Sequence, residues 1–329
     1  MKKILLIVCS LATTSGFSQS LVNKNATAEA RELYMYIANI GDSILAGQHS
    51  YNEEPAKYYN KAEEIAGQYP AVWGTDFYWN RKENPGDRIV EAAKQKHKEG
   101  AIVTLMWHVG RPTDDAPYGW KESVQNTLSD TEWQELVTPG TALHKRWLEQ
   151  VDVIAEPLKQ LQQANIPVLW RPYHEMNGVW FWWGNKKGPD GYQKLWKQLY
   201  ERLVNHHKLN NLIWVWNANG PRDIPQDEAY SYKDFYPGRD YVDILATDVY
   251  HSDYEQKDYE ELLQLADGKP VALGEVGELP KPAILEAQPK WSWFMVWSNW
   301  LETANTPERV KEIYNYPKIL TRNEIEIHE

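Results

Sequence analysis

The sequence predicts an α/β fold in which eight parallel strands alternate with helices and close into a single (β/α)8 barrel, the TIM barrel. Short, continuous apolar runs recur along the chain, and longer amphipathic segments separate them. Strands that are apolar on both faces and alternate with helices are typical of a parallel sheet covered on both sides. The chain has 329 residues. That length accommodates one such barrel, which needs about 250 residues.

The predicted strands are ILAG (44–47), AVWGTDF (71–77), AIVTLMW (101–107), IPVLWRP (166–172), LIWVWN (212–217), VDILATDVY (242–250), PVALGE (270–275) and WSWFMVW (291–297). The segments with helix-like patterning are 55–68, 85–99, 143–164, 191–208, 254–266 and 307–316. The links after the fifth and seventh strands are shorter and less regular. No repeat, low-complexity tract or linker divides the chain, so residues 19–329 are predicted to form one domain.

The N-terminus has the order of a bacterial secretory signal. Lys2 and Lys3 precede an apolar run from Ile4 to Leu11, and small and polar residues follow it. We therefore expect residues 1–18 to be removed after Ser18 and the protein to be secreted or periplasmic. The only cysteine, Cys9, lies in this segment, which leaves none for a disulfide or a cysteine-ligated metal. Five apolar residues before Cys9 are few for a lipoprotein signal.

Composition restricts the partners. The net charge is −11, and removal of the two N-terminal lysines makes it more negative. Such a surface repels nucleic acid and anionic polysaccharide. Seventeen Trp and twenty Tyr stand beside only five Phe, and flat rings with a polar edge suit the apolar faces of sugar rings. We expect a monomer without a membrane span that acts on a neutral polysaccharide or oligosaccharide.

Two glutamates stand at the ends of predicted strands. Glu175 follows the fourth strand and Glu275 ends the seventh. In a barrel of this type the carboxyl ends of the strands meet at one mouth, where catalytic groups gather. Two facing carboxylates are sufficient for glycoside cleavage: a separation of about 5–5.5 Å gives retention and about 6.5–9.5 Å gives inversion of the anomeric configuration.

The surroundings of both glutamates argue against the alternatives, a helix cap or a surface ion pair. Gly274 and Gly277 flank Glu275 closely, which suggests that substrate can approach. Glu175 precedes a cluster of rings. Arg171 and Tyr173 share the parity of Glu175 along the strand, so we expect both to face the barrel interior. Arg171 would then supply positive charge beneath the carboxylates or form a structural ion pair.

A family resemblance rests on several motifs. The stretch RPYHEMNGVWFWWG (171–184) closely resembles the fourth-strand motif of glycoside hydrolase family 26, whose best-known members are β-mannanases. GEVG (274–277) resembles its nucleophile motif, TDVY (247–250) its sixth-strand motif and WH (107–108) its third. The matches run from GQH (47–49) to Trp297, which is nearly the whole mature chain.

The resemblance implies that Glu175 is the general acid/base, Glu275 the nucleophile and Tyr250 a donor to that nucleophile. The acid must hold its proton at neutral pH, and the rings of Trp180, Phe181 and Trp182 would raise its pKa by desolvation. The further candidates for substrate contact are His108, Trp120, His174, Trp180, Asp248, Tyr250 and Trp297.

Individual roles follow for some of these residues. Trp180 and Trp297 would stack on sugar rings, and Asp248 would accept a hydroxyl. His174 would contact the sugar at the cleaved position, unless it is a buried core histidine. Trp120 is the least well supported, because the loop around residues 110–120 aligns poorly with the family.

The function implied is that of a retaining β-mannanase, which hydrolyses β-1,4 linkages in mannan, glucomannan or galactomannan through a covalent glycosyl-enzyme, without a cofactor or metal. A mixed-linkage β-glucanase, a xylanase or an exo-acting mannobiohydrolase on the same scaffold remain alternatives, because the loops 110–140 and 184–190 decide specificity. Two further alternatives are a sugar-binding barrel without catalysis and a metal hydrolase. No HExxH motif supports the latter.

Overall fold

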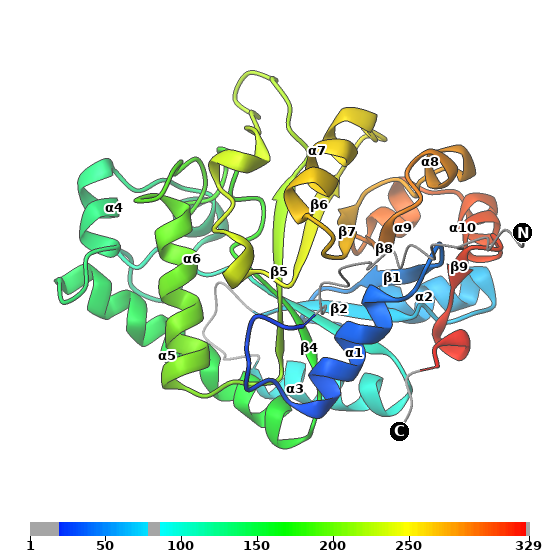
Figure 1. Ribbon diagram of the computed structural model, residues 1–329, viewed down its shortest axis with the longest axis horizontal. Coiled ribbons are helices and arrows are strands. Elements are labelled where there is room, and N and C mark those ends of the chain that lie inside the picture. The colour runs from blue at the N-terminus through cyan, green and yellow to red at the C-terminus, as the bar shows by residue number, and fades with distance from the viewer. Residues whose placement is uncertain (1–19, 78–85, 327–329) are drawn as a thin grey trace, which may run out of the picture.

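The computed structural model describes residues 20–77 and 86–326, which form a closed barrel of parallel strands (Figure 1). The strands follow one another around the barrel in chain order from β2 to β8. The first strand pairs with both β2 and β8, and this pairing closes the ring. The predicted (β/α)8 barrel is therefore confirmed. The predicted signal segment, residues 1–18, lies outside the described residues.

The barrel strands are β1 (Ile44–His49), β2 (Val72–Phe77), β3 (Ile102–Trp107), β4 (Val168–Pro172), β5 (Leu212–Asn219), β6 (Ile244–Val249), β7 (Val271–Val276) and β8 (Trp291–Val296). Each of the eight predicted runs overlaps one of them. Two strands continue two residues beyond their predicted ends: β1 reaches His49 and β5 reaches Asn219. A short strand, β9 (Ile319–Leu320), pairs with the start of β1.

The helices are α1 (Ala28–Ala38), α2 (Lys57–Ala66), α3 (Gly86–Lys98), α4 (Asp130–Leu136), α5 (Ala142–Gln163), α6 (Tyr192–Tyr200), α7 (Gln256–Ala266), α8 (Pro282–Ala287), α9 (Trp300–Thr303) and α10 (Pro307–Tyr314). Every predicted helical segment overlaps a helix. The segment 191–208 continues beyond α6 as a π-helical turn, Glu201–His206. The links after the fifth and seventh strands are short and irregular, as predicted. Two short 3-10 turns follow β5, and the six-residue α8 follows β7.

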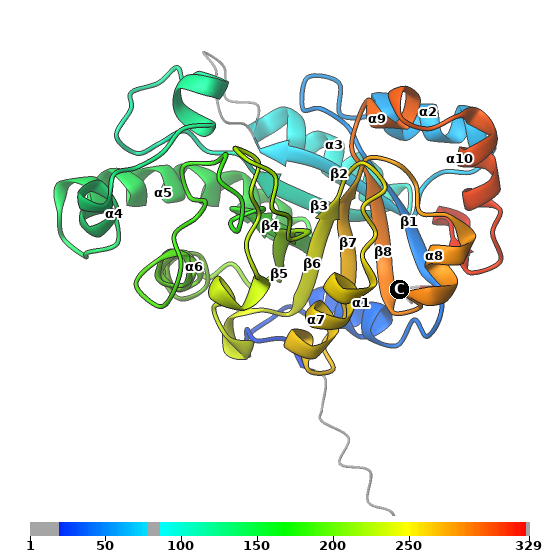
Figure 2. The ribbon, with the colours of Figure 1, turned by 90° about the horizontal axis from the view of Figure 1, so that it is seen from above.

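The helices surround the strands and cover the outside of the barrel (Figure 2). One end of the barrel is closed by α1, whose side chains Leu33 and Ile37 belong to the same buried cluster as Leu45, Ile213 and Trp293 from the strands. This apolar packing seals the end at which the strands begin. Polar residues are therefore left to gather at the opposite end, where the strands finish.

Within the described residues no helix has the length and apolar character that crossing a membrane requires. The longest helix, α5, has 22 residues but carries charged side chains along its length and Pro157 inside it. Its buried residues, among them Trp147 and Leu158, lie on the side that packs toward the barrel.

Candidate active site

Both predicted catalytic glutamates lie at the carboxyl ends of their strands, and both are buried. Glu275 is part of β7, and Glu175 follows β4 by three residues. Their side chains are close enough to influence each other: burial and then the negative charge of Glu275 raise the pKa of Glu175 to about 7. The two positions are three strands apart around the barrel, so the pair faces across its mouth.

Two donors hold the carboxyl of Glu175. The indole Nε1 of Trp180 donates to Oε2 at 2.7 Å, and the amide Nδ2 of Asn219 donates to Oε1 at 2.7 Å. Both bonds favour the ionised form, but burial outweighs them and the pKa is raised. The expected direction is confirmed. The ring of Trp182 has another role than expected, since it is fully buried and donates to the carbonyl of Val109.

The backbone around Glu175 is unusual. Tyr173 and Glu175 have φ angles of 49° and 52°, a left-handed conformation that is costly for residues with a Cβ. This geometry ends the alternation of β4, so Tyr173 points outward and accepts a hydrogen bond from Trp147 of α5 at 2.8 Å. The prediction that Tyr173 faces the barrel interior is therefore wrong. The N–H of Glu175 donates to the carbonyl of Asn217 on β5, which anchors the turn.

Glu275 has cationic and hydroxyl donors. Arg171 Nη2 donates to Oε1 at 2.9 Å, and the Tyr250 hydroxyl donates to Oε2 at 2.7 Å. His174 Nε2 lies 3.7 Å from Oε1. These groups stabilise negative charge on Glu275, whereas the donors to Glu175 among the described residues, Trp180 and Asn219, are neutral. The two carboxyls are thus held in different ways, as an acid and a nucleophile require.

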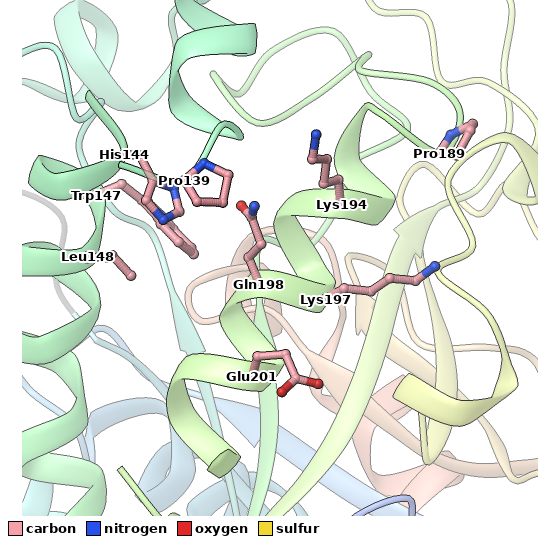
Figure 3. Close-up of a pocket in the computed structure, with 9 residues that line it drawn as sticks. All are labelled: Pro139, His144, Trp147, Leu148, Pro189, Lys194, Lys197, Gln198 and Glu201. Carbon is pink, nitrogen blue, oxygen red and sulfur yellow. The ribbon is translucent and has the colours of Figure 1, made fainter. Parts of the chain in front are cut away.

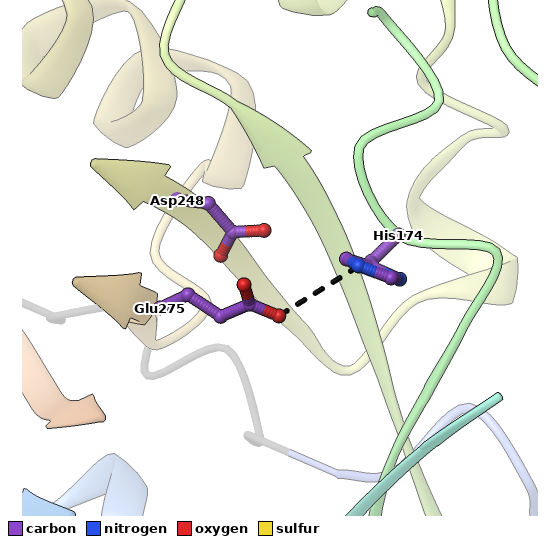
Figure 4. Close-up of side chains that lie close together, drawn as sticks. All are labelled: His174, Asp248 and Glu275. Atoms are coloured by element: carbon purple, nitrogen blue, oxygen red, sulfur yellow. Dashed lines mark ion pairs between the residues drawn. The ribbon is translucent and has the colours of Figure 1, made fainter. Parts of the chain in front are cut away.

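Arg171 is fully buried. It supplies positive charge next to Glu275 and also forms ion pairs, the two roles expected of it. Its Nε donates to Asn217 Oδ1 at 2.8 Å, and its Nη2 lies 3.5 Å from Asp248 Oδ1. Asp248 itself is 0% exposed, next to Glu275 (Figure 4). Burial, followed by the charge of Glu275, raises the pKa of Asp248, which favours its protonated form. Neither carboxylate oxygen of Asp248 has a hydrogen-bond partner among the described residues, and its expected role as an acceptor for a sugar hydroxyl stays a prediction.

The two glycines beside Glu275 make room for protein groups. A Cβ on Gly274 would lie 1.7 Å from Asn217 Oδ1, and one on Gly277 would lie 2.6 Å from the ring of Trp300 and 2.9 Å from that of Tyr250. The pairing of β6 with β7 also shifts register here, which places Asp248 opposite Glu275. The structure therefore corrects the interpretation that these glycines serve the approach of substrate, because they admit the residues that position Glu275.

Three further predicted residues meet at the mouth. His108 forms a 2.6 Å hydrogen bond between its Nδ1 and Asp76 Oδ2, and its ring centre lies 4.5 Å from that of His174 and 5.1 Å from that of Trp120. Burial, and then the charges of His108 and Arg171, lower the pKa of His174 well below its ordinary value. A neutral His174 beside Glu275 is therefore available as a hydrogen-bond donor.

Trp297 is half-buried just after β8. The ring of His49 stacks on it at 3.9 Å with an interplanar angle of 14°. His49 is fixed in turn by a 2.7 Å hydrogen bond between its Nδ1 and the Ser298 hydroxyl. One face of Trp297 is thus occupied by protein, and its stacking on a sugar stays a prediction.

Sequence reasoning missed three residues of this site. Asn219 was overlooked because β5 was ended too early, although its Asn-Ala-Asn sequence continues the parity of Asn217. His49 stood in the GQH motif without a role. Arg222 lies in the irregular loop after β5, and no local pattern marks it.

The groups at this place also include potential metal ligands. Among the described residues, His174, Asp248 and Glu275 have potential ligand atoms within 4.8 Å of one another. Arg171 already contacts both carboxylates, at 3.5 Å and 2.9 Å. A divalent cation there would be repelled by the guanidinium, so the residues present fit an arginine-compensated carboxylate pair better than a metal centre.

A separate pocket of about 280 Å³ lies in the helical layer between α5 and α6 (Figure 3). Its lining includes Pro139, Leu148 and Gln198 but none of the predicted site residues. The pocket therefore belongs to the packing of the outer helices.

The fold and the mouth define a class of protein: a barrel glycoside hydrolase with two unequally held glutamates. The comparison with known families agrees. The chain belongs to glycosyl hydrolase family 26, whose model matches residues 22–324.

Individual relatives are similar over most of the chain. A mannan endo-1,4-β-mannosidase of Thermothelomyces thermophilus is 37% identical over 94% of this chain and 64% of its own length. The chain spans 51% of mannan endo-1,4-β-mannosidase A of Piromyces sp, to which it is 31% identical over 95% of its own length. The solved structure of GH26A from Muricauda sp. MAR_2010_75 superposes with a TM-score of 0.91 at 70% identity, covering 92% of this chain and 99% of that one.

Replacement of Tyr250 by Phe is expected to lower kcat/KM about 10- to 100-fold, because a hydrogen bond to a charged group contributes about 1.5–3 kcal/mol. The ring packing against Trp300 is retained in the variant. Steady-state kinetics measure the effect, and the midpoint temperature of thermal unfolding is the control for an intact fold. Unchanged kinetics would show that the bond to Glu275 has no part in the reaction.

Prolonged dialysis against a chelator is expected to leave hydrolysis unchanged, since Arg171 compensates the carboxylates. Residual activity after removal of metal, with metal content checked by elemental analysis, is the measurement. Loss of activity that returns on addition of Zn²⁺ or Ca²⁺ would restore the metal-hydrolase alternative.

Proposed function

We propose that the protein is a retaining endo-β-1,4-mannanase that hydrolyses mannan, glucomannan or galactomannan. The observation that carries the proposal is the unequal environment of the two glutamates. Glu175 is a buried acid whose pKa is raised to about 7, and Glu275 is a carboxylate held by Arg171 and Tyr250. This division matches the acid and the nucleophile of a double displacement.

The reaction proceeds in two steps. Glu275 attacks the anomeric carbon and forms a covalent ester, while Glu175 transfers its proton to the departing glycosidic oxygen. Glu175, now ionised, removes a proton from water, and that water attacks the anomeric carbon and releases Glu275. Each displacement inverts the anomeric centre, so the product retains the β configuration. A pKa near 7 suits a group that must first give and then take a proton at neutral pH.

The choice of mannan rests on the relatives and on the mouth. The curated relatives cited above are mannan endo-1,4-β-mannosidases, and a β-mannanase from a symbiotic protist of the termite Reticulitermes speratus, 30% identical with a TM-score of 0.80 over 93% of this chain and 97% of its own, was solved with a gluco-manno-oligosaccharide. Trp120, Trp180 and Trp297 supply rings for sugar faces, and His108 and His174 supply ring nitrogens for hydroxyls.

Product analysis tests this proposal. The enzyme is incubated with mannan, glucomannan, galactomannan and mixed-linkage glucan, and early products are separated by chromatography. A ladder of manno-oligosaccharides supports endo-mannanase action. Mannobiose as the single product from the outset would instead indicate exo action. Products from mixed-linkage glucan alone would indicate a glucanase. Binding without cleavage of any of these substrates would indicate a sugar-binding barrel.

We also propose that residues 1–18 direct secretion and that the mature protein is monomeric. The charged, apolar and polar order of this segment supports export. N-terminal sequencing of protein from the medium or periplasm is expected to begin near Gln19, and light scattering is expected to give the mass of one chain. An intact N-terminus would contradict the removal of residues 1–18, and the mass of a dimer would contradict the monomeric state.

A further inference from the structure

Arg222, in the loop after β5, contacts both residues that donate to Glu175. The centre of its guanidinium lies 4.9 Å from the ring of Trp180. Its Nη1 donates a hydrogen bond to Asn219 Oδ1. The side chain therefore reaches the two neighbours of Glu175 from one point, and no motif or relative cited above assigns it a role.

The loop that carries Arg222 is firmly placed. Its residues, yellow-green in Figure 1, project beyond the end of β5. Asp227 binds the guanidinium through both carboxylate oxygens, at 2.9 Å and 2.7 Å. Arg222 and Ala229 exchange backbone hydrogen bonds of 2.9 Å and 3.0 Å. Arg222 is thus held in one orientation from its own loop.

The contact with Asn219 decides which way the amide points. An arginine has only donors, so the atom of the Asn219 amide that faces it must be the oxygen. The amide nitrogen is then turned toward Glu175, where it donates to Oε1 at 2.7 Å. Removal of Arg222 would leave this amide free to rotate and to lose that bond.

The contact with Trp180 fixes the second donor. A guanidinium over an indole is attracted to the ring face and restrains its plane. A Cβ on Gly178 would lie 2.3 Å from the same ring, so the glycine makes room for Trp180. The restrained indole directs its Nε1 to Glu175 Oε2 at 2.7 Å.

We propose that Arg222 is a positioning residue for the general acid, which orients Asn219 and Trp180 so that both donors converge on Glu175. The inference rests on the proposed function in that Glu175 is the acid. Through these contacts the loop after β5 controls the transfer of the proton to the leaving group, although Arg222 itself touches no reacting atom.

The charges around Glu175 give the direction of the effect. Glu275 faces it from β7, Asp248 from β6 and the Tyr250 hydroxyl from the turn after β6. The positive charge of Arg222 opposes these groups and lowers the pKa of Glu175. Loss of this charge and of two oriented donors both raise that pKa, so the alkaline limb of the pH profile should move upward.

The experiment compares Arg222→Ala, Arg222→Lys and the wild type, with Arg309→Ala on α10 as a matched surface control. In Arg222→Ala, kcat/KM on polysaccharide is expected to fall about 10- to 100-fold, within the contribution of general acid catalysis. On an aryl glycoside with a good leaving group the fall should be below about threefold. Arg222→Lys keeps the charge but not the guanidinium that orients Trp180, so its pH midpoint should lie between those of the wild type and Arg222→Ala, and Arg309→Ala should match the wild type throughout.

A second readout does not need turnover. The indole N–H of Trp180 reports the ionisation of Glu175 in a nitrogen–proton correlation spectrum, assigned by its absence in Trp180→Phe. The midpoint of this titration should rise in Arg222→Ala, and in Arg222→Lys it should lie between the values of Arg222→Ala and the wild type. An unmoved midpoint with equal losses on both substrates would overturn the proposal and leave Arg222 a purely structural residue. Because this titration is independent of the sugar cleaved, failure of the mannanase assignment is separately visible in the product analysis.

Discussion

Glu275→Ala is expected to lower kcat/KM by about 10⁴-fold or more on every substrate, polysaccharide and activated aryl glycoside alike. The reason is that the first displacement has no attacking group without this carboxylate, and a better leaving group cannot replace it. Initial rates on mannan and on an aryl β-mannoside measure the effect.

The control for this prediction is the stability of the fold. Arg171 is fully buried, and loss of Glu275 leaves it with Asp248 at 3.5 Å as its remaining carboxylate. Uncompensated buried charge is costly. Glu275→Gln keeps the shape of the side chain and should be equally inactive with a smaller loss of thermal stability. Added azide should restore cleavage of the aryl substrate in Glu275→Ala and give the α-glycosyl azide. Near-normal turnover by either variant would contradict the assignment.

Glu175→Ala is expected to separate the substrates. On mannan kcat/KM should fall about 10²- to 10⁴-fold, the usual contribution of general acid catalysis. On an aryl glycoside whose leaving group needs little protonation, kcat/KM should stay near the wild-type value, because this parameter reports the first displacement. The second displacement lacks its base, so kcat should fall on both.

The pH dependence gives an independent measure of the same residue. The acid works only when protonated, and its pKa is about 7. Activity of the wild type on mannan is therefore expected to decrease as the pH rises through about 7. With the aryl substrate, kcat/KM of Glu175→Ala should lack this alkaline limb. Equal losses on both substrates, or an alkaline limb that persists in the variant, would assign the proton to another group.

The fold was predictable because its signals are local. Runs such as AIVTLMW (101–107) are apolar on both faces, which suits a strand buried between the barrel interior and the helices. The strand β5 was predicted to end too early because its last residues are not apolar. Asn217 and Asn219 are polar and read as a strand end, although their side chains are buried and hydrogen-bonded at the mouth.

The placement of the two glutamates at one mouth of the barrel was predictable from the sequence. Glu175 and Glu275 stand at strand ends, and the topology of the barrel brings them together. One error arose where the backbone departs from the regular alternation of a strand. The left-handed backbone at Tyr173 turns that ring outward. The register shift that places Asp248 opposite Glu275 was likewise not predicted. Neither feature has a signature in a single sequence.

The contacts made by Arg222 could not be predicted from the sequence for a related reason. They join a loop after β5 to Trp180 in the turn after β4, and each link depends on the orientation of a side chain. The two glycines are a similar case. Gly274 makes room for Asn217, and Gly277 makes room for Trp300 and Tyr250, but the sequence alone does not show which neighbour fills the space of a missing Cβ.

The central claim is that Glu275 forms a covalent bond to the sugar. An activated 2-deoxy-2-fluoro-β-mannobiosyl fluoride tests it most directly, because the fluorine slows the second displacement and the good leaving group permits the first. Mass spectrometry of the peptic digest should find the sugar on the peptide that contains Glu275, with inactivation in proportion to labelling. A label on another residue, or no label together with release of the α anomer from mannan, would contradict the account.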